Sequence, residues 1–153
     1  MQAEVEWVLD TWVLVKAGDI DFEGWWDAVD LLDEISRRHR LALDTERSID
    51  AEYLRNIKPR TIVARWWTDI QRRTGRTVRY SSTPHKRDSS HLLNRLHFDS
   101  SDLKFVAVAS KTSSRLLVAE ESDYTEEVKN YLLLAMKTRV LTLAEARNLA
   151  RNP

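Results

Sequence analysis

The chain has 153 residues, 42% hydrophobic and 31% charged, a composition that fits one globular domain with its own core and excludes a disordered chain. It has no cysteine, which excludes disulfides and thiolate chemistry. No apolar run approaches the roughly 20 residues that span a membrane, and the N-terminal residues show no signal-peptide pattern. We therefore expect a cytoplasmic protein without membrane association.

Positive charge is concentrated in the middle of the chain, although the formal net charge is zero. From Lys58 to Phe98, ten Lys and Arg residues stand against two acids, which is a local excess of eight. Such segregation predicts a basic arm or face that binds a polyanion. The alternative is that these Arg side chains only solvate an exposed pair of helices.

Strands and helices alternate along the first part of the chain. An apolar strand ends near Asp10, and the apolar character continues over residues 13–15 before a loop. A helical stripe predicts a helix over residues 24–38, and residues 41–43 predict a second strand. Ser48 is a suitable N-cap for the next helix, in which apolar residues recur at four-residue intervals.

The basic stretch, at about residues 58–98, is expected to be a helical insertion rather than a separate domain. Its main helix begins near Thr61, after a proline that breaks the preceding helix. Residues 77–80 fit either a short strand or an extended loop. Residues 81–90 are typical of a loop, and a short helix is expected over residues 90–96.

The last third of the chain returns to the alternating pattern. Small apolar residues over 105–109 predict a buried helix, and residues 116–118 predict a strand that is covered on both faces. Thr125 can cap the helix that follows, and residues 139–141 resemble a last short strand. A capping box beginning at Thr142 predicts a terminal helix.

This order of elements predicts the fold class. Strands that alternate with helices form a mainly parallel sheet with helices on its faces. We therefore predict a single α/β domain over residues 1–153, built as a three-layer α/β/α sandwich.

Acidic residues recur where predicted strands end or helices begin. Ligands bind at the carboxyl ends of the strands in an open α/β sheet, and clustered carboxylates suit a hard divalent cation. The acids in question are Asp10, Glu52, Asp102, Glu121 and Asp123.

In order and spacing these acids resemble those of the PIN-domain family of metal-dependent ribonucleases, and the resemblance spans nearly the whole chain. The matching segments are VLDTWVLV (residues 8–15), SIDAEYL (48–54) and DLKFVAVASKTSSRLLVAEESDY (102–124). The resemblance implies a carboxylate cluster that holds one or two Mg²⁺ or Mn²⁺ ions and hydrolyses RNA. Small single-domain members are often toxins of the VapC type, which a short antitoxin protein neutralises.

Carried over to this chain, the resemblance implies five catalytic residues. Asp10, Glu52 and Asp102 match the first three acids of the family, Glu121 matches the fourth, and Asp123 matches an additional acid two residues later. The implied metal ligands among them are Asp10, Asp102, Glu121 and Asp123.

Two positions depart from the family pattern. Trp12 replaces a small polar residue, and its indole either crowds the site or turns into the core. Glu120 and Glu121 replace a Gly-Asp pair, so the fourth ligand is Glu121, Asp123 or neither. The acids also have simpler interpretations, since Asp102 suits the positive end of a helix dipole and Asp123 can cap a helix.

Basic and aromatic residues between positions 58 and 98 are the predicted RNA contacts. Arginine side chains track phosphates, and exposed aromatic rings stack bases. We expect Trp66 to be a core residue, whereas Trp67 fits the core, a base stack, a homodimer contact or an antitoxin contact. His85, His91 and His97 fall on different helix faces and favour a solvated or RNA-contacting surface over a zinc site. The predicted phosphate contacts are Arg60, Arg65, Arg72, Arg73, Arg76 and Arg79.

The leading hypothesis from the sequence is a Mg²⁺- or Mn²⁺-dependent endoribonuclease, and the resemblance extends to the toxins of toxin–antitoxin pairs. The alternative is a catalytically impaired PIN-fold protein that binds RNA or protein. A third and weaker hypothesis is a nuclease that recognises DNA structure, because the same chemistry cleaves either polymer.

Overall fold

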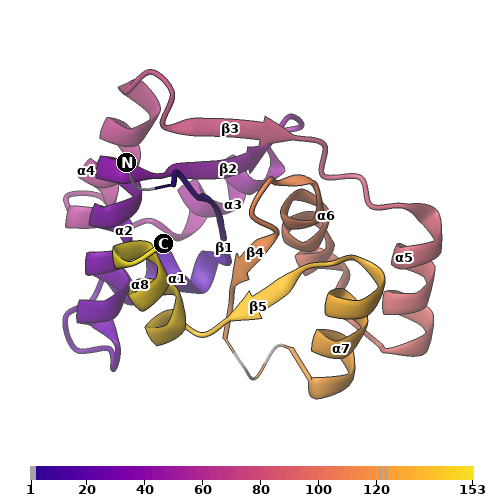
Figure 1. Cartoon of the computed structure of the whole chain (residues 1–153). Helices are drawn as coiled ribbons and strands as arrows, with labels where there is room; N and C mark the ends of the chain where they lie inside the picture. Colours follow the sequence, from indigo (N-terminus) through magenta and orange to yellow (C-terminus); the bar gives the residue numbers. More distant parts are fainter. Residues whose placement is uncertain (1–2, 121, 123) are drawn as a thin grey trace.

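A five-stranded parallel sheet forms the centre of the fold (Figure 1). The computed structural model describes residues 3–120, 122 and 124–153. The strands are β1 (Glu6–Leu9), β2 (Arg40–Asp44), β3 (Thr77–Tyr80), β4 (Leu116–Val118) and β5 (Arg139–Leu141), in the order β3-β2-β1-β4-β5. The central strand β1 pairs with β2 and β4, so that Trp7 lies opposite both Leu41 and Leu116. The side chains of β1 are buried throughout, as expected for a strand covered on both faces.

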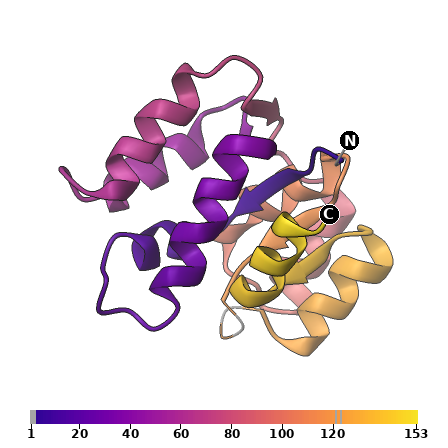
Figure 2. The same cartoon turned by 60° about the vertical axis from the view of Figure 1, so that its left-hand side comes forward.

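Helices connect the strands and lie on both sides of the sheet (Figures 1 and 2). They are α1 (Thr11–Ala17), α2 (Trp25–Arg38), α3 (Ser48–Asn56), α4 (Ile62–Arg72), α5 (Lys86–Ser90), the π-helix η1 (His91–Arg95), the 3₁₀-helix η2 (Ser100–Asp102), α6 (Leu103–Lys111), α7 (Glu126–Ala135) and α8 (Leu143–Arg151). The connection from β1 to β2 runs toward one edge of the sheet, and the connection from β3 to β4 runs back toward the other edge. Because crossover connections are right-handed, these two connections lie on opposite faces of the sheet. Within the described part of the chain, no helix is both long and apolar enough to cross a membrane.

The predicted α/β class and parallel sheet are confirmed, and the arrangement is compatible with three layers. Several predicted helix starts are also confirmed. Thr61 and Thr125 cap α4 and α7 with their side chains, and Thr142 forms a capping box with Glu145 at the start of α8. These starts were predictable because each depends on residues that are adjacent in sequence.

Two stretches differ from the sequence prediction. Residues 11–17, where the apolar character was expected to continue from the first strand, form α1 because Asp10 caps a helix there: its Oδ1 accepts the Trp12 backbone N–H at 3.2 Å. Residues 58–98 are more than a helical insertion, because they also contain β3, which pairs with β2 at the edge of the sheet.

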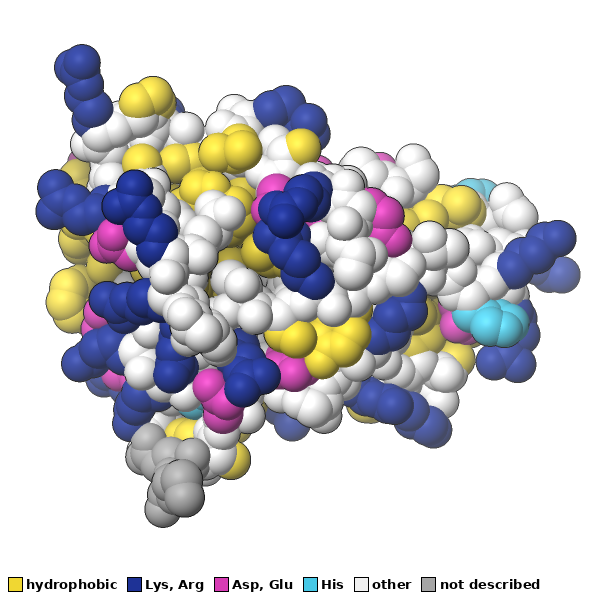
Figure 3. Space-filling view, turned by 90° about the horizontal axis from the view of Figure 1, so that it is seen from above, with side chains coloured by type: hydrophobic (Ala, Val, Ile, Leu, Met, Phe, Trp, Pro, Cys, Tyr) yellow, Lys and Arg dark blue, Asp and Glu magenta, His cyan; other side chains and the backbone are white. Residues whose placement is uncertain are grey.

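The expected loop over residues 81–90 is also only partly a loop. Its second half forms α5, and the His85 side chain accepts the Arg87 backbone N–H at 3.3 Å, at the start of that helix. α5 continues directly into η1. Together these two helices form an arm, Lys86–Arg95, at one end of the molecule (Figures 1 and 3).

A group of ion pairs joins the C-terminal helix α8 to α2. Arg147 Nε lies 2.6 Å from Asp30 Oδ2, and Arg151 Nη2 lies 2.7 Å from the same oxygen. Partial burial acts to raise the pKa of Asp30, but hydrogen bonds from Arg147 and Arg151 outweigh it and hold that pKa below its ordinary value. The Asp30 carboxylate therefore stabilises the packing of α8 on α2.

We expect Asp30→Asn to lower the free energy of unfolding at pH 7 by about 1–2 kcal/mol, because it weakens two charge-assisted hydrogen bonds. Since the folded pKa of Asp30 is depressed, this contribution is fully present above the ordinary value of 3.8 and is lost as the pH falls through the lower folded pKa. Urea titrations at pH 7 and below pH 4 measure the difference. Asp33→Asn is the control on the same helix, because its exposed pair with Arg37 contributes little; equal effects of both variants at pH 7 would contradict the assignment.

Candidate functional site

Asp10 lies at the carboxyl end of the central strand. It follows β1 directly and is 7% exposed. Its backbone N–H donates to the Val118 carbonyl of β4 at 2.9 Å, while its side chain caps α1. The carboxylate is therefore fixed at the edge of the sheet where α/β folds bind their ligands.

Glu52 is joined to the neighbour of Asp10. The Thr11 hydroxyl donates to Glu52 Oε2, which connects the start of α1 to α3. The other carboxylate oxygen, Oε1, lies 2.8 Å from the Lys104 ammonium group. Both oxygens of Glu52 therefore accept hydrogen bonds from within the protein.

Asp102 lies beside the same group of contacts. It ends the short helix η2 and immediately precedes α6. Lys104 Nζ donates to the Ser101 carbonyl at 2.5 Å while it pairs with Glu52, so the ammonium group holds the start of α6 against α3. Through Thr11 and Lys104 the structure thus joins the chain segments that carry Asp10, Glu52 and Asp102.

The pKa of Tyr53 reflects the negative charge of this region. The side chain is completely buried, and its hydroxyl donates to the Leu9 carbonyl at 2.5 Å. Burial raises the pKa of Tyr53 well above its ordinary value, and the negative charges of Asp10 and Glu52 raise it further. The phenol therefore remains protonated and serves as a fixed donor beneath the acids.

Two residues of this region were absent from the predicted site. Lys104 follows Asp102 by two positions, but its sequence position alone does not show that it reaches a residue of α3. Tyr53 was recognised only as part of an apolar helix stripe, because its hydrogen bond to β1 joins residues 44 positions apart. Neither contact leaves a local sequence signal.

Trp12 does not turn fully into the core, which was one of the two alternatives left open by the sequence. Its ring is partly exposed and packs edge-on against Phe22 in the loop between α1 and α2, with 5.6 Å between ring centroids. Lys16 Nζ lies 5.9 Å from the centre of the same ring. The indole therefore lies between α1 and this loop and packs against Phe22.

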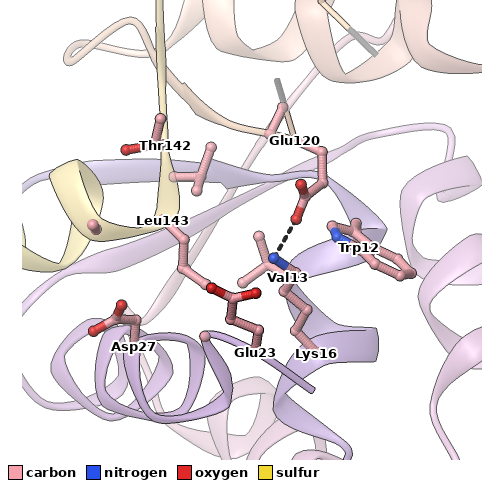
Figure 4. Close-up of a pocket in the computed structure, with 12 residues that line it drawn as sticks. Trp12, Val13, Lys16, Glu23, Asp27, Glu120, Thr142 and Leu143 are labelled. Atoms are coloured by element: carbon pink, nitrogen blue, oxygen red, sulfur yellow. Dashed lines mark ion pairs between the residues drawn. The ribbon is translucent and has the colours of Figure 1, made fainter. Parts of the chain in front are cut away.

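A cavity of about 320 Å³ lies on that side of α1 (Figure 4). Glu120, which follows β4, and Lys16 of α1 point toward each other across it, with 2.5 Å between Oε1 and Nζ. Glu23 and Asp27 contribute two further carboxylates to its lining. Glu120 therefore forms an ion pair with Lys16.

The described residues do not by themselves assemble a metal site. In residues 3–120, 122 and 124–153, no group of three or more His, Asp or Glu side chains is arranged to hold a metal ion. The contacts of Glu52 agree with this, because Thr11 and Lys104 already occupy its two oxygens. The predicted ligands Glu121 and Asp123 lie outside the described residues.

The six predicted phosphate-binding arginines do not form one set. Arg79 donates from both Nη atoms to Asp50, each at 2.9 Å, and also to the Asp44 carbonyl. Arg76 donates to the His39 carbonyl at 2.8 Å, and Arg73 donates to the Ser36 carbonyl at 3.1 Å. These three arginines thus connect elements of the fold, whereas the exposed ones are Arg60, Arg65 and Arg72, together with Arg73.

The two tryptophans of α4 are both core residues. Trp66 is buried, as predicted, and its indole N–H donates to the Leu32 carbonyl of α2 at 2.7 Å. Trp67 is also buried and packs edge-on against Tyr53, with 5.4 Å between ring centroids. Neither ring is therefore exposed for stacking on a base.

We expect Arg79→Ala to lower the free energy of unfolding by about 2–3 kcal/mol, because it leaves the buried Asp50 carboxylate without its bidentate partner. Arg72→Ala removes the same charge from an exposed position and should change stability by less than about 0.5 kcal/mol. Urea denaturation of both variants makes the comparison. Equal small losses would show that the Arg79–Asp50 pair does not stabilise the fold.

Comparison of the chain with protein-family profiles, curated proteins and solved structures finds no match. The resemblance to the PIN domain therefore stays a prediction.

Proposed function

We propose that this protein is a PIN-like endoribonuclease, dependent on Mg²⁺ or Mn²⁺, whose site lies at the carboxyl end of β1. The observation that carries this proposal is the connection of three acid-bearing segments through Thr11 and Lys104. Asp10 comes from the central strand, Glu52 from α3 and Asp102 from the start of α6. Acids drawn from separate elements to one edge of a parallel sheet suit a ligand site there.

In this proposal the acids have different roles. Asp10 and Asp102 would hold the cation, together with Glu121 or Asp123 from the segment after β4. Glu52 is a positioning residue, because its hydrogen bonds with Thr11 and Lys104 fix α3 against α1 and α6. A bound Mg²⁺ or Mn²⁺ would supply an activated water and offset the charge that develops on the leaving oxygen.

Lys104 has a role that follows from its surroundings. Carboxylates that are packed together repel one another, so a cluster without a cation is costly. The Lys104 ammonium group supplies positive charge 2.8 Å from Glu52 and so reduces that repulsion. It would keep the acidic site folded before a metal ion binds.

The same proposal names the partners. Single-stranded RNA is the substrate, and exposed arginines such as Arg60, Arg65 and Arg72 are its predicted phosphate contacts. If the protein is the toxin of a toxin–antitoxin pair, a short antitoxin protein would cover the acidic site. A homodimer stays a prediction, but Trp67, the contact residue on which it was based, is buried in the core.

A second candidate function is a PIN-like protein that binds RNA or another protein without cleaving it. The observation that favours it is the state of Glu52, whose two oxygens are occupied by Thr11 and Lys104. The described residues also form no metal-binding group of three. In that case Lys104 would permanently replace the cation that the site otherwise requires.

The purified protein should cleave single-stranded RNA with Mg²⁺ or Mn²⁺ and lose this activity in EDTA. We expect Asp10→Asn to reduce cleavage by about a hundredfold or more, the scale of losing one transition-state contact. Asp21→Asn, which removes an exposed acid from the loop after α1, is the matched control and should retain activity. A thermal melt of each variant confirms folding. A folded wild-type protein that cleaves no RNA with either metal would favour the binding function.

We expect Lys104→Met to lower the free energy of unfolding by about 1–2 kcal/mol in EDTA, because Glu52 loses its charged partner. Mn²⁺ should restore the free energy of unfolding to that of the wild type, since a divalent cation can then neutralise the acids. Lys111→Met is the control, because Lys111 donates to the carbonyls of Ser81 and Thr83. Its loss of stability should be the same with and without Mn²⁺. Urea denaturation measures both, and a Lys104→Met protein indifferent to Mn²⁺ would contradict this role.

A further inference from the structure

The arm formed by α5 and η1 carries a hollow on its outer surface. The hollow has a volume of about 450 Å³. Each side chain that lines it can donate a hydrogen bond, and none is a carboxylate. The lining residues are Arg87, Ser90, His91, Asn94 and Arg95.

The spacing of these residues explains why they share one face. Arg87, His91 and Arg95 recur at four-residue intervals along the continuous helix, so their side chains project from the same side. Figure 3 shows Lys, Arg and His side chains gathered at this end of the molecule. The arm thus presents two guanidinium groups, one above the other, to the solvent.

The opposite face of the arm is fixed to the fold. Leu92 is completely buried, and the buried Asp88 carboxylate accepts a hydrogen bond from the Tyr131 hydroxyl of α7 at 2.7 Å. Burial, together with the hydrogen bond to Asp88, raises the pKa of Tyr131 to about 12, so the hydroxyl stays protonated and keeps this bond. The His91 ring stacks on the Tyr131 ring, with 4.2 Å between their centroids. The arm is therefore packed against α7, and the acid that it carries faces inward.

The arginines of the hollow differ from those that hold the fold together. Arg76 and Arg79 donate to protein carbonyls and carboxylates. Arg87 and Arg95 are exposed, and within the described part of the chain neither makes a side-chain hydrogen bond or ion pair. Their guanidinium groups are available to an anion from outside, and the planar fork of Arg matches the oxygens of a phosphate.

The arm also leads directly to the acidic site. Phe98 follows η1 and packs against Tyr124, with 5.2 Å between ring centroids. The next residues, 99–102, form the turn and the short helix that carry Asp102. The chain that leaves the arm therefore runs directly into the segment that carries Asp102.

We propose that the hollow on the α5–η1 arm binds the phosphodiester backbone of the single-stranded RNA that reaches the acidic site; this inference rests on the proposed function. The hollow favours a nucleic acid over a protein partner because its lining has only polar donors, whereas the buried centre of a protein interface is mainly apolar and aromatic. It contributes affinity and register along the strand and takes no part in the cleavage step.

Fluorescence anisotropy of a labelled single-stranded RNA, measured in EDTA with the full chain, tests this directly because no metal-dependent cleavage can occur. The double variant Arg87→Ala/Arg95→Ala should bind at least about tenfold more weakly than wild type. Its plot of log affinity against log salt should be shallower by about 1.4, which corresponds to two lost phosphate contacts on a single strand.

The matched control is Arg115→Ala/Arg139→Ala, which removes the same charge from exposed arginines next to the amino ends of β4 and β5. This control should bind RNA as wild type does. Equal weakening by both pairs, unchanged affinity of the arm variant, or a wild-type protein that does not bind RNA would each overturn the proposal. The milder pair Arg87→Gln/Arg95→Gln, which keeps polar side chains, guards against a folding defect and should show the same direction of change.

The failure of this inference can be distinguished from failure of the proposed nuclease function. RNA binding that depends on the arm, without cleavage in Mg²⁺ or Mn²⁺, supports the hollow and contradicts the nuclease. Cleavage that is unaffected by the arm variant at limiting RNA overturns the hollow and supports the nuclease. A labelled DNA strand of the same sequence shows whether the hollow distinguishes RNA; equal binding of DNA would overturn the choice of RNA as its ligand.

Discussion

The arrangement of the candidate site depends on one carboxylate that is shared between two donors. Glu52 of α3 accepts hydrogen bonds from Thr11 at the start of α1 and from Lys104 at the start of α6. Three helices that are separate in sequence are therefore joined near the carboxyl end of β1, which Asp10 follows directly, while Asp102 immediately precedes α6. Carboxylates that lie close together repel one another, and the ammonium group of Lys104 offsets part of this repulsion. In the proposed function, this contact would also affect how readily a metal ion binds.

Charge elsewhere on the molecule is divided between structural and surface roles. Arg79 and Arg76 are drawn into the fold by Asp50 and by the His39 carbonyl, and they hold the edge strand β3 and its approach in place. The α5–η1 arm does the reverse: its acid Asp88 faces α7, and its arginines face solvent. The exposed positive charge of residues 58–98 therefore lies in two places, on and around α4 at residues such as Arg65 and Arg72, and on the arm at Arg87 and Arg95.

Much of the fold could be predicted from the sequence because its signals are local. The capping residues Thr125 and Thr142 lie next to the helices that they start, and the buried strand at 116–118 is a continuous apolar run. The strand β3 remained undecided because four partly buried residues carry no clear alternation, and only its pairing with β2 makes it a strand. α1 was missed because Asp10, predicted as a site residue, also caps a helix.

The candidate site was less predictable because its contacts join distant residues. Asp10 and Glu52 were identified from their order along the chain, but the link through Thr11, and the Lys104 ion pair 52 positions from Glu52, required the folded structure. Likewise, no local pattern shows which arginines will pair with an internal carboxylate, as Arg79 does and Arg87 does not.

Adding Mn²⁺ to the ¹⁵N-labelled protein tests for the proposed cation site most directly, because the ion broadens the amide signals of nearby residues. The site described here predicts that the signals of residues 10–12 and 101–104 broaden first, before those of α8. Broadening spread over surface acids, or none near Asp10, would contradict a cation site at the carboxyl end of β1.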